Sequence, residues 1–177
     1  MQRVCNPAAP CSVIAGCSRQ ASTITMRTLL ILAAATVADA VVYTGSKSLA
    51  PWYNISWVSN TATERIELTV EARTTGWVGF GLAEAGGMRS ADIFIASVSS
   101  TGVMTSGDYY SIAEEAPKKD EIEDWALLSA TEANGLTTIK FSRAFDTSDS
   151  QDRPFVNRMN GFPQKIIFSV GGNDELS

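Results

Sequence analysis

The chain has 177 residues and a formal net charge of −5, and it contains no histidine. The acidic balance argues against a nucleic-acid partner, which usually meets a basic surface. The absence of histidine excludes Ser-His-Asp and Cys-His nucleophiles and the usual histidine-ligated zinc and copper sites within this sequence. An enzyme built from these residues alone would be limited to carboxylate, lysine or tyrosine chemistry.

The first 40 residues are typical of targeting sequence. Residues 1–25 hold all three cysteines and no acidic residue, which indicates a presequence or a stretch upstream of the true start at Met26. Residues 26–40 combine a charged start, a short apolar run and an Ala-Asp-Ala ending, as a secretory signal peptide does. We therefore predict a secreted or secretory-lumen protein whose mature part, residues 41–177, has 11 basic and 18 acidic residues and no cysteine for a disulfide.

Alternating apolar and polar residues predict β-strands through most of the mature part. The run 92–98 is nearly all apolar, which is typical of a strand buried on both faces. The expected strands are 53–57, 66–73, 76–82, 92–98, 103–111, 125–129, 137–143 and 165–170.

Turn signals separate these strands. Asn134-Gly135 favours a tight hairpin turn, whereas 114–124 and 146–154 are polar and are expected to be loops. No segment shows sustained helical periodicity. The pattern predicts an all-β protein, an antiparallel immunoglobulin-like β-sandwich.

A glycine-rich bend within 76–98 joins two of the expected strands. Alternation places Trp77, Gly79 and Gly81 on one face of the first strand, and apolar side chains on the other. Because a face lined by glycine lets a ligand or another backbone approach closely, we expect an occupant near this bend.

The sequence blocks GWVGFG, SADIFIA, DYYS, KKDEIEDWALL and TTIKFSRAFDTSDSQD, in this order, resemble a DOMON domain. This is the β-sandwich named for the N-terminal part of dopamine β-monooxygenase-related proteins, and the resemblance covers about residues 53–170. It implies an extracytoplasmic module of one of two kinds. One kind carries b-type haem held by a methionine and a histidine. The other precedes copper, ascorbate-dependent monooxygenase domains and binds a metal ion without haem.

The resemblance implies a metal site for the second kind. Asp92 and Asp124 match its two carboxylate ligands, and Ile93 and Tyr109 match residues that contribute backbone carbonyls. Such an oxygen ligand set suits a hard cation such as Ca²⁺. Asp92 favours the dopamine β-monooxygenase-like branch, because the haem branch usually lacks an acid at this position. The residues alone leave open that both acids lie in solvated turns.

Met88 stands where the haem branch has its methionine ligand. A Met/His pair can hold haem, but methionine also commonly fills irregular gaps in a core, and the histidine is missing here. In the family that histidine lies near the C-terminal end, so we expect 41–177 to be a DOMON domain that is incomplete at its C-terminus.

Three functions follow. The first is a secreted DOMON module that is accessory to copper- and ascorbate-dependent hydroxylation. Downstream domains would carry out this reaction and would hold all the copper, and whether the parent protein is an enzyme stays open. The second is a haem b electron carrier that passes electrons to a membrane cytochrome. The third is an extracellular carbohydrate- or ligand-binding module with Trp77 or Trp52 as a stacking surface. The Asn54-Ile55-Ser56 sequon also predicts a glycoprotein.

Overall fold

The computed structural model describes residues 40–155 and 164–175. The expected presequence and signal peptide therefore lie outside the described residues, apart from Ala40. In the described part of the chain, strands are the only regular elements, and no helix there is long and apolar enough to span a membrane. The strands are β1 (Val42–Ala50), β2 (Tyr53–Asn60), β3 (Arg65–Ala72), β4 (Val78–Leu82), β5 (Ala91–Val98), β6 (Met104–Ser111), β7 (Lys118–Lys119), β8 (Ala126–Ala133), β9 (Leu136–Ala144) and β10 (Ile166–Val170).

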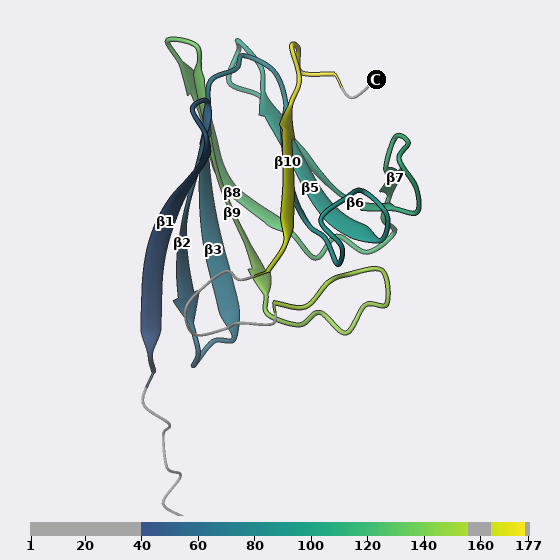
Figure 1. Cartoon of the computed structure of the whole chain (residues 1–177). Helices are drawn as coiled ribbons and strands as arrows, with labels where there is room; N and C mark the ends of the chain where they lie inside the picture. Colours follow the sequence, from purple (N-terminus) through teal and green to yellow (C-terminus); the bar gives the residue numbers. More distant parts are fainter. Residues whose placement is uncertain (1–39, 156–163, 176–177) are drawn as a thin grey trace, which may run out of the picture. The chain divides into compact units, whose positions relative to one another are not determined.

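The strands form two five-stranded antiparallel sheets. One sheet has the order β1-β2-β3-β9-β8, and the other has the order β10-β4-β5-β6-β7. In Figure 1 the blue strands β1 to β3 lie with the green β8 and β9 in one layer, and the teal β5 and β6 lie with the yellow β10 in the other. The prediction of an all-β antiparallel sandwich is confirmed.

Period-two alternation explains how β2 and β3 are buried. Tyr53, Ile55 and Trp57 of β2 are buried, and the exposed Asn54 lies between them on the outer face. Every residue of β5 is buried, as its continuous apolar sequence predicts. A strand covered on both faces can serve a site on either side.

The hairpin between β8 and β9 turns at Asn134-Gly135. Both residues have positive φ, 55° and 71°, and the flanking Ala133 and Leu136 are register partners. A two-residue turn with this backbone matches the right-handed twist of the strands that it joins. The hairpin prediction is therefore confirmed.

Two strands were not predicted. β1 is an edge strand with mostly exposed or half-buried residues, so its sequence does not alternate between apolar and polar residues. Its Gly45 lies opposite Trp57, whose ring would be 2.2 Å from a Cβ added there. The prediction of a loop throughout 114–124 was wrong at β7, a two-residue strand that pairs with β6.

The main hydrophobic core lies between the two sheets and includes Tyr53, Phe80, Phe94 and Phe141. A second, smaller cluster is centred on Ile93 and Ile95 of β5. These residues alternate with the core residues of the same strand, so this cluster covers the opposite, outer face of the sheet. Each face of β5 borders one candidate site.

Candidate functional site

Three aspartates meet between the sheets. Asp92 begins the inward row of β5, because it is in phase with Phe94, and Asp108 of β6 is the register partner of Phe94. Asp152 comes from the loop after β9. All three side chains are buried, and their carboxylate oxygens lie within 4.8 Å of one another. The fold therefore concentrates negative charge where water is largely absent.

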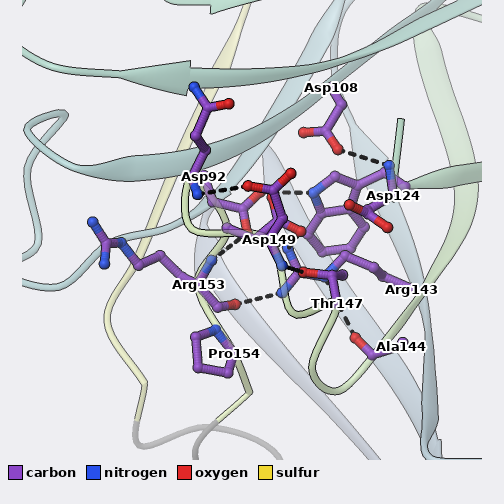
Figure 2. A network of polar contacts seen from close by, with 12 residues as sticks. Asp92, Asp108, Asp124, Arg143, Ala144, Thr147, Asp149, Arg153 and Pro154 are labelled. Atoms are coloured by element: carbon purple, nitrogen blue, oxygen red, sulfur yellow. Dashed lines mark hydrogen bonds and ion pairs between the residues drawn. The ribbon is translucent and has the colours of Figure 1, made fainter. Parts of the chain in front are cut away.

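Among the described residues, Arg143 is the one whose guanidinium lies in this cluster. It continues the inward row of β9 after Ile139 and Phe141, and its side chain is fully buried. Its Nη1 pairs with the Asp92 carboxylate and lies 3.6 Å from Asp152 Oδ2. Figure 2 shows Arg143 and Asp92 within one polar network.

Arg143 is also held by main-chain and aromatic contacts. Its Nη2 donates to the carbonyl oxygen of Arg153, and its Nε donates to that of Ala144 at 3.4 Å. The guanidinium carbon lies 4.3 Å from the ring centroid of Trp125 and 5.2 Å from that of Phe155, within cation–π distance. These contacts fix the position of the positive charge.

Both oxygens of Asp92 accept hydrogen bonds. The indole Nε1 of Trp125 donates to Oδ1 at 2.8 Å, and the backbone N–H of Arg153 donates to Oδ2 at 3.0 Å, alongside Arg143. Donors on both oxygens satisfy the hydrogen-bonding capacity of a buried carboxylate. Asp92 is thus the best-satisfied acid of the cluster.

Asp108 and Asp152 are less well satisfied. Oδ2 of Asp108 accepts from the backbone N–H of Asp124 at 3.0 Å, but Oδ1 of Asp108 and Oδ2 of Asp152 are buried without a hydrogen-bond partner. Burial is the main cause that raises the pKa of Asp108 to about 8 and that of Asp152 to about 6, and the nearby charge of Asp92 raises both further.

The donor set fits a hard cation. Three carboxylates face one guanidinium, so the ionised cluster carries an excess of negative charge, and two carboxylate oxygens have no hydrogen-bond donor. Ca²⁺ takes oxygen ligands of this kind. A bound divalent cation would balance the charge that Arg143 leaves unmatched.

The structure brings only part of the predicted ligand set together. Asp92 lies in the cluster, and the half-buried Asp124 lies beside it through its backbone bond to Asp108. Ile93 and Tyr109 are register partners on β5 and β6, and their side chains pack on the outer face. The backbone-carbonyl ligands stay a prediction.

Sequence reasoning missed Asp108, Arg143 and Asp152. Asp108 and Arg143 lie on strands that it did predict, but only Arg143 is in phase with a buried apolar row, Ile139 and Phe141. A charged residue that continues an apolar row was the available signal. It needed the register of the sheets before it could identify a cluster.

Met88 lies on the other side of β5, at an outer-face cavity of about 680 Å³. It packs against the outer cluster of Ile93 and Ile95. The glycines Gly79 and Gly81 line this cavity as the alternation predicts. Further lining residues include Trp77, Tyr109, Lys119 and Ile167.

The architecture is that of a two-sheet antiparallel β-sandwich domain with a buried acidic cluster and an outer-face cavity. The family model for the DOMON domain matches residues 50–161. The chain belongs to the DOMON domain family, and within it to the branch of the DBH-like monooxygenase proteins.

Two mouse relatives illustrate this branch. The chain is 38% identical over 90 residues to DBH-like monooxygenase protein 1 of Mus musculus, which covers 51% of this chain and 14% of the relative. It is 31% identical over 120 residues to DBH-like monooxygenase protein 2 of Mus musculus, which covers 68% of this chain and 19% of the relative. The chain thus spans less than a quarter of the length of these curated relatives.

A solved structure shares the fold. The cytochrome b domain of pyranose dehydrogenase from Coprinopsis cinerea superposes with a TM-score of 0.50 at 12% identity, covering 70% of this chain and 64% of that chain. At this identity the likeness concerns the sandwich fold alone.

Proposed function

We propose that this chain is a secreted DOMON module in which the buried carboxylates hold a Ca²⁺-like ion. In the full-length protein it would be accessory to copper- and ascorbate-dependent hydroxylation by domains outside this chain. The names of the similar proteins, DBH-like monooxygenases, support this setting, and copper would be bound only in those other domains.

One observation carries the metal proposal. Oδ1 of Asp108 is buried without a hydrogen-bond partner, and Oδ2 of Asp152 has no hydrogen bond and only a 3.6 Å ion pair with Arg143 Nη1, which also pairs with Asp92. Leaving buried oxygens without hydrogen bonds costs free energy. A hard cation would satisfy both. Asp92, Asp124 and the main-chain oxygens of Ile93 and Tyr109 complete the ligand set that the family resemblance predicts.

The ion would have a structural role. Asp92 and Asp108 belong to one sheet, whereas Asp152 follows the last strand of the other. A cation held by all three carboxylates would link the two sheets at this end of the sandwich. Since only the folded state brings these residues together, binding would stabilise folding.

Thermal unfolding with and without Ca²⁺ tests the proposal. A hundredfold excess of Ca²⁺ over its Kd should add about 2.7 kcal/mol of stability, or roughly 6–12 °C in Tm for a domain of this size. Asp108→Asn should abolish this gain, while its amide oxygen can still accept the backbone bond from Asp124.

Asp146→Asn is the matched control, because Asp146 is exposed and only caps a local turn through Ser148. It should keep the full Ca²⁺ effect. Asp92 is a poor probe, because its removal leaves the buried charge of Arg143 without its partner whether or not Ca²⁺ is present. An equal Ca²⁺ response in wild type and Asp108→Asn would refute the metal site.

Secretion and glycosylation belong to the same proposal. The signal-peptide pattern of 26–40 supports secretion, and Asn54 is exposed on the outer face of β2. Expression in a secretory host should yield a cleaved chain that carries a glycan, and Asn54→Gln should remove the glycan. An intact N-terminus in the secreted product would contradict the signal-peptide assignment.

Haem b held by Met88 is a second candidate function. The outer-face cavity of about 680 Å³, with Met88 in its wall, favours it. The sequence supplies no histidine for the other axial position, so the ligand pair of the haem branch is incomplete in this chain. If Met88 binds haem iron, titration with haem should give a shifted Soret band that Met88→Leu alters; an identical spectrum in both proteins would exclude Met88 as a ligand.

A further inference from the structure

The outer face of the sheet β10-β4-β5-β6-β7 carries two adjoining hollows. The larger has a volume of about 680 Å³ and the smaller about 160 Å³. Both are lined by Trp77, Ile95 and Tyr109, so these three residues stand at the junction. We call the two hollows together the outer-face cleft.

The two ends of the outer-face cleft differ in chemistry. The larger end is mostly apolar and includes Met88, Ile93 and Ile167. The smaller end is lined by Ser97, Thr105, Ser106 and Asp174. An apolar pocket with a few convergent polar groups is the usual form of a small-molecule site.

The aromatic walls are held in place by glycines. A Cβ at Gly171 would lie 2.1 Å from Nε1 of Trp77, so this indole rests directly on the backbone. A Cβ at Gly107 would lie 2.7 Å from Cε2 of Tyr109, so that ring rests on its own strand. Rings fixed by their backbone contacts lose little freedom when a ligand arrives, which favours binding.

The polar end favours a head group that donates hydrogen bonds. The hydroxyl oxygens of Ser97 and Thr105 lie 2.8 Å apart across neighbouring strands, and Ser97 Oγ also donates to the main-chain carbonyl oxygen of the acidic residue Asp174 at 3.4 Å. An anionic head would be repelled by Asp174. Lys119 lines the larger hollow, but its Nζ pairs with Glu123 at 2.9 Å, so its charge is already matched.

We propose that the outer-face cleft binds a small amphiphile. Its apolar body fills the larger hollow, and a head that donates hydrogen bonds, a hydroxylated or an ammonium group, lies against Ser97, Thr105 and Asp174. The proposal is independent of the metal site, because Asp92 lies on the inner face of β5 while Ile95 lies on the outer face.

Four probes test the proposal by isothermal titration calorimetry in chelator, below their micelle concentrations. Octyl glucoside carries a hydroxylated head, octylammonium an ammonium head and octanoate an anionic head, while glucose lacks the apolar body. We expect octyl glucoside or octylammonium to bind about tenfold more tightly than octanoate, and glucose not to bind measurably. The tighter of the first two probes identifies the head group.

Two variants locate the site on the folded protein. Trp77→Ala should weaken binding of the better probe about tenfold, as loss of a central aromatic contact does. Val58→Ala, a change at an exposed residue on β2 of the other sheet and outside the cleft lining, should leave binding unchanged. Ser97→Ala, a smaller change that keeps the fold, should also weaken it. Octanoate binding as tightly as the other two, or no effect of either cleft variant, overturns the proposal.

Discussion

Replacing the buried arginine of the acidic cluster tests whether its ion pair with Asp92 stabilises the fold. Arg143→Met keeps most of the side-chain length and removes the charge that faces Asp92 and Asp152. Removing one partner of a buried ion pair typically costs about 3–5 kcal/mol, because the other charge stays buried and unpaired. For this domain that corresponds to roughly 7–22 °C in Tm.

Urea unfolding followed by tryptophan fluorescence measures the loss. Trp125, one of four tryptophans, packs on the Arg143 guanidinium and donates to Asp92, so its share of the emission reports on the cluster. Circular dichroism on the same samples shows whether the unfolding is a single transition. Ca²⁺ should recover part of the loss, because a cation would then face carboxylates that have lost their arginine.

Two further variants separate charge from shape. Arg143→Lys keeps the charge but loses the planar guanidinium and the stacking on Trp125. The free energy of unfolding of this variant should therefore lie between those of wild type and Arg143→Met. Adding Asp92→Asn to Arg143→Met should cost less than the sum of the two single changes, because the pair is coupled. A loss under about 1 kcal/mol for Arg143→Met would show that the pair does not form as described.

Two other predictions concern the buried hydroxyl and the titrating acid. Tyr53→Phe removes the 2.9 Å bond from Tyr53 Oη to the Gly79 carbonyl and should cost about 1–3 kcal/mol in urea unfolding; an unchanged midpoint would contradict a buried bond. In chelator, Tm should fall as pH rises from about 4 to about 8, because folded Asp108, with its pKa raised to about 8, keeps a proton that the unfolded chain releases near pH 4. Asp108→Asn should remove the fall between about pH 6 and pH 8 and leave the part below about pH 6 that Asp152, with its pKa raised to about 6, contributes. A flat wild-type profile would contradict the raised pKa values.

The sequence predicted the fold well where local rules decide it. The alternation around Tyr53 and the Asn134-Gly135 turn each depend on a few neighbouring residues, and both match the structure. β1 escaped prediction because an edge strand needs no buried face and Gly45 interrupts its pattern. The segment forms a strand because it pairs with β2, and this pairing cannot be recognised from a short stretch of sequence.

The site was predictable only in part, for a similar reason. Asp92 was identified through its place in a family pattern. Asp108 and Arg143 gain their meaning from the register, which pairs Asp108 with Phe94 and sets Arg143 opposite Ile66. Only Arg143 follows an apolar row of its own strand, after Ile139 and Phe141, whereas the strand of Asp108 gives no such local signal. Asp152 lies in a loop, where no strand alternation indicates which side chains are buried.

The alternation of β5 explains how one short strand can serve two sites without mixing them. Asp92 points between the sheets toward Arg143, whereas Ile93, the next residue, points outward to the cleft. The hydrogen bonds of Asp92 come from Trp125, Arg143 and Arg153, whereas Ile93 packs in the outer cluster. Changes at Asp108 and Trp77 should therefore have additive effects on stability, and Ca²⁺ should not alter amphiphile affinity. A strong coupling between them would mean that β5 moves as a unit when either site is filled.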